Sequence, residues 1–324
     1  MIPLKDEQET TITPVATYTI IFITSLVFVW QMIRGINDQT IAYTFGFVPA
    51  KYTMGQMADY FSLMNKLLSP FTYMFLHGGL WHFIGNMWFL NIFGDNIEQE
   101  LGPFRFTVFY LVCGLLAAFF HFLLNHSSAL PTIGASGAIA GVMGAYFLLH
   151  PGNKILTLIP VLIFPLFVRI PAFIFLGIWF FLQFMNAAGH GAGSGIAWWA
   201  HIGGFLSGMV LIGVNTKLPK TGVREWSDRY TRKKRSPRLH VITPGEGSSD
   251  LNLYGTIALT SLEALTGTKK LVTIPGGFKK SIYRVVIPAG IQRGSMLRLK
   301  GMGKSIPGMP PGDLFLRVEI KNII

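Results

Sequence analysis

Six apolar stretches, each about 20 residues long, dominate the first two thirds of the chain. About 20 apolar residues in a helix are enough to cross the hydrocarbon core of a bilayer. The chain is 51% hydrophobic and 13% charged, whereas soluble domains average roughly 25% charged residues. We therefore expect an α-helical polytopic membrane protein with six transmembrane helices. The predicted spans are residues 15–33, 79–97, 104–124, 133–150, 170–188 and 196–214.

The fifth span begins inside a longer apolar run, residues 155–188, which is too long for one helix. Pro160, Pro165 and Arg169 interrupt this run. Proline breaks helices, and a charge is unfavourable in the middle of a membrane. We therefore place the span after Arg169 and residues 155–168 at the membrane interface.

The distribution of basic residues predicts the orientation. Nine of the 27 Lys and Arg residues lie between Lys217 and Arg238, directly after the last apolar stretch. An excess of Lys and Arg beside a span marks the cytoplasmic side, and with six spans both termini are expected there. Because the membrane accounts for the basic charge, no nucleic-acid partner is expected. Residues 1–10 are polar and acidic, which argues against a cleaved signal peptide. With no organelle-targeting segment visible, the predicted location is a prokaryotic plasma membrane.

Two residues that can act together in catalysis lie at matching positions in two spans. Ser136, in the segment 134–137 (GASG), opens the fourth span, and His201 lies near the start of the sixth. Both spans are predicted to cross the membrane in the same direction. Each residue lies about five residues from the start of its span, which is about 8 Å into the membrane at 1.5 Å per residue. Neutral imidazole is the usual base that activates a serine hydroxyl. Between Glu100 and Glu225 the chain contains no Asp or Glu, so the expected unit is a Ser–His pair without a carboxylate.

Small residues recur at i, i+4 beside both of these side chains. Such faces let membrane helices approach closely, which would bring Ser136 and His201 within hydrogen-bonding reach. The alternative is that the stripes only pack helices and that the serine is incidental. The stripes comprise Gly137, Gly141 and Ala145 in the fourth span and Ala200, Gly204 and Gly208 in the sixth.

His82 and Asn86 are four residues apart in the second span, hence on one helical face. His and Asn side chains can donate hydrogen bonds to the oxyanion formed in acyl transfer. The alternative is a polar pair that joins helices. A metal site using His82 and His201 is disfavoured, because no carboxylate or thiolate lies nearby to complete it. Cys113 is the single cysteine and lies in an apolar run, so no cofactor and no metal are expected.

The character of the sequence changes after the last span. Residues 215–249 are first basic and then rich in Pro, Gly and Ser, which is typical of a linker. From residue 250, short alternating runs separated by turn signals predict a small β-sandwich or barrel with a helix near 261–265. The predicted domains are therefore 1–214 in the membrane, a cytoplasmic linker over 215–249, and a soluble β domain over 250–324.

Four motifs taken together resemble the rhomboid intramembrane serine proteases, over roughly residues 15–214. They are 82–86 (HFIGN), Gly94/Glu98/Gly102 at i, i+4, i+8, 134–137 (GASG) and 200–204 (AHIGG). The resemblance implies that Ser136 is the nucleophile, His201 the general base, and His82 and Asn86 the oxyanion donors. It also implies a cavity open to the outside, with the loop 189–195 as its cap. Substrates would be single-span membrane proteins.

One departure from that family bears on activity. Rhomboids usually carry an aromatic residue four positions after the serine to support the histidine ring, and here the residue is Ala140. Histidine orientation would then depend on another side chain, Trp198 or Trp199. The alternative function is a non-catalytic membrane adaptor, although such relatives generally lose the serine or the histidine. A transporter is disfavoured, because the ionisable residues trace no path across the membrane.

Residues 250–321 resemble the C-terminal peptide-binding domain of DnaJ-type cochaperones. The carriers are 263–268 (EALTGT), 287–290 (IPAG), 297–301 (LRLKG) and 312–314 (GDL). The His-Pro-Asp motif and the Cys-x-x-Cys zinc module of that family are missing, so ATPase stimulation is not expected. The resemblance implies binding of unfolded or extended peptide segments by strand addition to a sheet edge. The alternative is a passive tail.

Overall fold

The structure, a computed structural model, describes residues 1–8, 10–36, 38–161, 164–189, 197–215, 231, 241–242, 251–276, 279–304 and 310–320. The chain divides into two compact units, Met1–Lys233 and Lys234–Ile324. Each unit has its own hydrophobic core. Most of the predicted linker, 215–249, lies outside the described residues.

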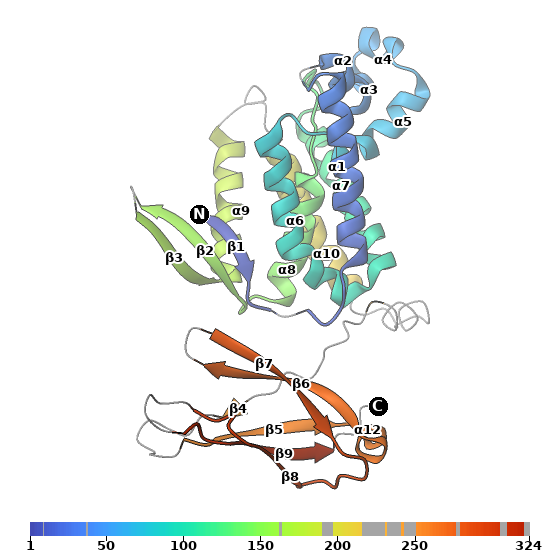
Figure 1. Cartoon of the computed structure of the whole chain (residues 1–324). Helices are drawn as coiled ribbons and strands as arrows, with labels where there is room; N and C mark the ends of the chain where they lie inside the picture. The colour runs from blue at the N-terminus through green and yellow to red at the C-terminus, as the bar shows by residue number, and fades with distance from the viewer. Residues whose placement is uncertain are drawn as a thin grey trace. The chain divides into compact units, whose positions relative to one another are not determined.

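Within the described part of the first unit, six helices of 14 to 22 residues pack side by side (Figure 1). Each overlaps one predicted span, which confirms the α-helical class. Short helices fill the connection between the first and second of them. The long helices are α1 (Val15–Arg34), α6 (Leu80–Leu101), α7 (Pro103–Leu124), α8 (Ser136–Leu149), α9 (Ala172–Gly189) and α10 (Trp198–Asn215); the short ones are α2 (Gln39–Phe45), α3 (Ala50–Thr53), α4 (Gly55–Tyr60), α5 (Leu63–Thr72) and the 3₁₀ turn η1 (Tyr73–Phe75).

Not all six helices have the hydropathy of a membrane span. Helices α1, α7 and α9 are long and apolar enough to cross a membrane, and α8 is apolar but shorter, at 14 residues. Helix α6 is long enough but carries charged and amide side chains, among them Asp95 and Glu98. The number of membrane crossings therefore stays a prediction.

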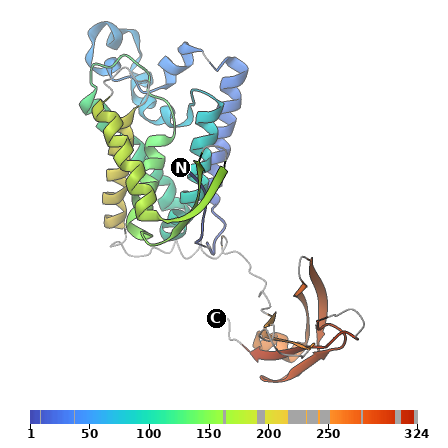
Figure 2. The same ribbon diagram turned by 90° about the vertical axis from the view of Figure 1, so that its left-hand side faces the viewer.

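The apolar segment before α9 is a β-hairpin. Strand β2 (Lys154–Val161) pairs antiparallel with β3 (Phe164–Pro171), and Pro160 lies opposite Pro165. The prolines exclude a helix there. The N-terminal strand β1 (Ile2–Asp6) completes a three-stranded sheet in the order β1-β2-β3 (Figure 1). Figure 2 shows the N-terminus beside this sheet. The sequence had suggested neither the hairpin nor the pairing of the N-terminus with it.

Glu98 fixes the start of α1 against the end of α6. Its carboxylate accepts hydrogen bonds from the backbone N–H of Ala16 (2.9 Å) and Thr17 (2.8 Å) and from the Thr17 hydroxyl (2.8 Å). These are N–H groups that the first turn of a helix leaves without an intrahelical partner. Gly94 lies against Thr17, and Gly102, with φ 77°, ends α6. The motif at 94–102 therefore caps and packs helices.

The small-residue stripes form the contact between α8 and α10. Helix α8 is buried from Gly137 to Tyr146. A Cβ atom added to Gly204 would overlap the carbonyl oxygen of Gly137, and one added to Gly208 would overlap that of Gly141. The backbones are thus in direct contact, as the stripes predicted.

Replacing Gly208 tests this contact. Gly208→Val would push its side chain into the backbone of α8, and we expect a loss of roughly 1–3 kcal/mol or more in the free energy of unfolding. Gly177→Val on α9 is the matched control, because a Cβ atom added there would meet no atom of the described residues within 4 Å. Unfolding in detergent micelles measures both; equal stability of the two variants would contradict the contact.

The second unit is rich in β structure, as predicted. Its larger sheet has the strand order β4-β5-β9-β8, in which β5 and β9 are parallel, and a separate antiparallel ribbon pairs β6 with β7. Side chains from both sheets share one core, including Ile257, Val272 and Leu316. The elements are β4 (Val241–Ile242), β5 (Leu253–Leu259), α12 (Ser261–Thr266), β6 (Thr268–Gly276), β7 (Lys279–Ile287), β8 (Met296–Leu299) and β9 (Leu314–Ile320).

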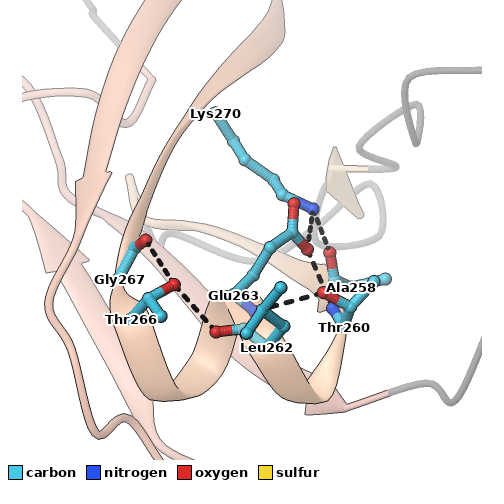
Figure 3. Close-up of polar contacts among 7 residues, drawn as sticks. All are labelled: Ala258, Thr260, Leu262, Glu263, Thr266, Gly267 and Lys270. Carbon is cyan, nitrogen blue, oxygen red and sulfur yellow. Dashed lines mark hydrogen bonds and ion pairs between the residues drawn. The ribbon is translucent and has the colours of Figure 1, made fainter.

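A capping box starts the short helix α12 (Figure 3). The Thr260 hydroxyl accepts the Glu263 N–H (3.2 Å), and the Glu263 carboxylate accepts the Thr260 N–H (2.8 Å). Lys270 donates to Glu263 (3.0 Å) and to the carbonyl of Ala258 (2.8 Å), which joins β6 to the helix and to β5. The Thr260 N–H, followed by Lys270, holds the pKa of Glu263 below its usual value.

Removing this carboxylate should destabilise the second unit in a pH-dependent way. A group with a depressed folded pKa stabilises above its unfolded pKa and loses that contribution as the pH falls. Loss of a cap costs about 1 kcal/mol, so we expect Glu263→Ala to lower the melting temperature by about 4–8 °C at neutral pH. The difference in melting temperature between the wild type and Glu263→Ala should become smaller at acidic pH. Calorimetry of the full chain measures it, with the exposed Gln292→Ala as control; a gap independent of pH would contradict the assignment.

Candidate functional site

Ser136 and His201 are in contact. The Ser136 hydroxyl lies 2.7 Å from His201 Nε2, within hydrogen-bonding range. Ser136 is the first residue of α8, and His201 lies in the first turn of α10. The glycine contact between these helices sets their spacing. The expected juxtaposition of the two side chains is therefore present.

The other ring nitrogen of His201 meets an amide side chain. His201 Nδ1 lies 2.8 Å from Oε1 of Gln183, which projects from α9. A carbonyl oxygen can only accept, so Nδ1 carries the hydrogen. In the neutral ring Nε2 is then unprotonated and can accept the Ser136 proton. The geometry holds His201 in the tautomer of a base.

Aromatic rings border His201 on two further sides. Of the two tryptophans expected to orient it, Trp198 lies edge-on, with ring centroids 6.0 Å apart. Trp179 of α9 lies 6.0 Å away at an interplanar angle of 36°. Ala140 is fully buried within α8. The aromatic support for His201 that Ala140 cannot give thus comes from Trp179 on α9 and from Trp198 on α10, the helix of His201 itself.

His82 is held as a donor beside Ser136. The N–H of Gly78 points at His82 Nδ1 (3.4 Å), so Nδ1 acts as acceptor and the hydrogen of the neutral ring belongs on Nε2. A Cβ atom built on Gly134 would lie 2.9 Å from His82 Nε2 and 3.8 Å from the Ser136 hydroxyl. His82 Nε2 and the serine therefore flank the same glycine.

Asn86 lies one turn further along α6 and is 7% exposed. Its side-chain nitrogen donates one hydrogen to the backbone carbonyl of His82 (2.9 Å). An amide nitrogen has two hydrogens. The second is available for another acceptor, and Asn86 lines the same cavity as Ser136.

The chain before Ser136 is fixed from two sides. Phe47 and Thr132 exchange backbone hydrogen bonds of 2.9 and 2.8 Å. Gly134 donates its N–H to the carbonyl of Tyr73 (2.9 Å). The connection between α1 and α6 thus positions the turn that presents the serine. Its backbone N–H groups stand at the N-terminus of α8, where the helix dipole favours negative charge.

A cavity of about 560 Å³ joins these groups. Side chains from α6, α8, α9 and α10 line it, and Ser136 and His201 are partly exposed to it. Water can therefore reach the serine. The polar residues that line it include His82, Asn86, Thr132, Ser136, Gln183 and His201.

Some predicted features lie elsewhere or outside the described residues. The proposed cap, residues 189–195, is described only at Gly189. His77 is buried behind the site, with its ring 5.2 Å from that of His82. Within the described ranges no three His, Cys, Asp or Glu side chains gather where they could hold a metal ion.

Gln183 and Trp179 were not predicted from the sequence. Both lie in the apolar run predicted to be the fifth span. Gln183 did carry a signal, since an amide inside a membrane span is rare and functional by default. Trp179 carried no such signal, because tryptophan is common among the packed side chains of apolar helices.

Comparison with known proteins agrees with this architecture. Residues 64–217 match the family model of the Rhomboid domain, and residues 253–323 match that of the DnaJ C terminal domain. The first unit thus contains a rhomboid domain and the second a DnaJ C-terminal domain. With its apolar helices, the chain is a membrane protein.

Three relatives illustrate the similarity. "RHOMBOID-like protein 6, mitochondrial" of Arabidopsis thaliana is 30% identical over 187 residues, 55% of each chain. "Inactive RHOMBOID-like protein 8" of the same plant is 34% identical over 70 residues, 22% of this chain and 19% of the relative. "Chaperone protein DnaJ" of Gloeobacter violaceus is 44% identical over 45 residues, 14% of this chain and 12% of the relative. The chain thus spans about half the length of the first relative and less of the others.

A substitution at Gly134 tests the geometry around the serine. Gly134 has φ +127°, and an added Cβ would lie 2.8 Å from the His82 ring. His82 is predicted to be an oxyanion donor, and displacing one such donor costs about 10²-fold in kcat. We therefore expect Gly134→Ala to slow reaction of Ser136 with a fluorophosphonate by a similar factor. Gly79→Ala is the control, since nothing lies within 4 Å of that position. A Gly134→Ala protein that reacts at the wild-type rate would contradict this geometry.

Proposed function

We propose that the chain is an intramembrane serine endopeptidase that cleaves single-span membrane proteins. The observation that carries the proposal is the 2.7 Å contact between Ser136 and His201, inside a rhomboid domain. Membrane helices surround this pair, and the cavity gives it access to water. Peptide hydrolysis needs both a nucleophile with its base and a supply of water.

In the first half of the reaction Ser136 attacks the scissile carbonyl carbon, and His201 Nε2 takes the hydroxyl proton. The resulting oxyanion would accept hydrogen bonds from Asn86 Nδ2 and His82 Nε2, with the backbone N–H of Ser136 as a further donor. These donors are already oriented, so stabilising the charge requires little reorganisation. His201 then returns its proton to the leaving amine as the C–N bond breaks.

The second half repeats these roles with water. A water molecule from the cavity attacks the acyl-enzyme ester while His201 Nε2 accepts its proton. The same donors hold the second oxyanion. When the ester bond breaks, the proton on His201 goes to Ser136, and the carboxylic acid product leaves. The cycle consumes one water and restores the resting pair.

The basic residues after α10 support a proposal for the orientation of the chain in the membrane. Backbone N–H of Thr13 donates to the carbonyl of Thr231 (2.7 Å), so the segment before α1 and residue 231 lie at one end of the helices. We propose that this end faces the cytoplasm. In sealed vesicles, a protease added on the cytoplasmic side should cleave within residues 217–238. Cleavage by a protease added on the side of the cavity would contradict this orientation. The rhomboid relative quoted above is named mitochondrial, which gives no support to the predicted prokaryotic membrane.

A non-catalytic adaptor is the second candidate. Two observations favour it: the residue four positions after the serine is Ala140, and one relative is named inactive. In that case the same cavity would hold a membrane segment without cutting it. The complete set of Ser136, His201, His82 and Asn86 favours the protease.

Labelling with a fluorophosphonate separates the two candidates. The protease should form an adduct on Ser136 that is lost in Ser136→Ala and in His201→Ala, because the hydroxyl needs its base. Asn86→Ala should slow cleavage of a single-span reporter by about 10²-fold. Well-folded wild-type protein that neither labels nor cleaves would establish the adaptor instead.

The second unit is proposed to bind extended peptide segments. Strand β8 is at an edge of the larger sheet, and Met296 on it is 56% exposed. A peptide could add as a further strand there. Deletion of residues 240–324 should then raise KM for a full-length substrate but not for its isolated membrane segment. Unchanged kinetics for both would leave the domain a passive tail.

A further inference from the structure

We propose that Gln183 is a positioning residue that keeps His201 in its working tautomer and stabilises the imidazolium formed during catalysis. This inference rests on the proposed protease function. Serine proteases of the soluble type give this task to a buried carboxylate. The described parts of α8, α9 and α10 contain no Asp or Glu, so an amide would take it here.

The direction of the Gln183 amide is fixed by a second contact. Its Nε2 donates to the backbone carbonyl of Trp179, one turn earlier on α9 (3.3 Å). A carbonyl can only accept, so the NH₂ end must face Trp179 and the oxygen must face His201. In the flipped amide, Gln183 Oε1 would face the carbonyl oxygen of Trp179, so that two acceptors would oppose each other. The NH₂ group would then face His201 Nδ1. The hydrogen-bond pattern therefore assigns Oε1 as acceptor from Nδ1–H.

The environment makes this single acceptor important. Gln183 borders the cavity but is only 7% exposed, and a hydrogen bond is stronger where the surroundings are less polar than water. When Nε2 takes the Ser136 proton, the ring becomes a cation. The histidines that interact electrostatically with it are His82 on α6 and His121 on α7, and a histidine side chain cannot supply a compensating negative charge. The Gln183 oxygen dipole is thus the group that faces the new charge at Nδ1.

Gln183 and Trp179 act from one face of α9. They are four residues apart, and both lie beside His201. The position of α9 therefore sets the orientation of the imidazole, whereas α8 and α10 set its distance from Ser136.

Two substitutions at Gln183 separate positioning from packing. Gln183→Leu keeps most of the volume but removes the acceptor; we expect kcat to fall by about 10- to 100-fold, with KM unchanged. Gln183→Glu keeps the acceptor and adds charge. It should retain more activity than Gln183→Leu and move the acid limb of the kcat/KM profile to higher pH, because a carboxylate stabilises imidazolium. Asn186→Leu, partly exposed on the same helix, is the control and should behave as wild type.

The outcomes are distinct from those of the proposed function. If wild-type protein neither labels nor cleaves, the protease assignment fails. If wild-type protein is active and Gln183→Leu matches it, or if Gln183→Glu is no better than Gln183→Leu and leaves the pH profile unmoved, Gln183 is only a packing residue. Thermal unfolding of each variant in micelles identifies a general loss of fold, and a Gln183→Leu protein that melts with the wild type and loses kcat supports the inference.

Discussion

The close approach of α8 and α10 is the constraint on which the site depends. Their backbones touch because Gly204 and Gly208 leave no side chain between them and the carbonyls of Gly137 and Gly141. In lipid the hydrophobic effect does not drive helices together, so packing of this kind supplies much of the association energy. Ser136 and His201 each adjoin this contact. A larger residue at the interface would separate the hydroxyl from the imidazole before it altered any polar group.

The hydrogen bonds of the site hold its two histidines, His82 and His201, in opposite tautomers. Gly78 turns the hydrogen of His82 toward the serine side, and Gln183 turns that of His201 away from it. One ring is thus prepared to donate and the other to accept. Neither assignment needs a charged partner, which suits a site within the membrane, where an unpaired carboxylate would be strongly disfavoured.

Much of this arrangement was predictable from local patterns. The positions of the long helices followed from hydropathy, the α8–α10 contact from the spacing of small residues, and the places of Ser136 and His201 near the starts of these two helices from the same pattern. Gln183 escaped because hydropathy does not give the rotation of α9 about its own axis. The β1-β2-β3 sheet escaped because the pairing of residues 2–6 with 155–158 joins segments about 150 positions apart. The turn at Gly134 escaped because it depends on backbone contacts with Phe47 and Tyr73, which lie far away in the sequence, in the connection between α1 and α6.

The central claim, that His201 Nε2 is the unprotonated base bonded to Ser136, can be observed directly. The ¹⁵N spectrum of histidine-labelled protein in bilayers, assigned by loss of the signals in His201→Gln, reports the protonation of each ring nitrogen. We expect Nδ1 protonated and Nε2 unprotonated at neutral pH, with the Nε2 resonance shifting in Ser136→Ala as its hydrogen bond is lost. A protonated Nε2, or an Nε2 resonance indifferent to removal of the serine hydroxyl, would contradict the account.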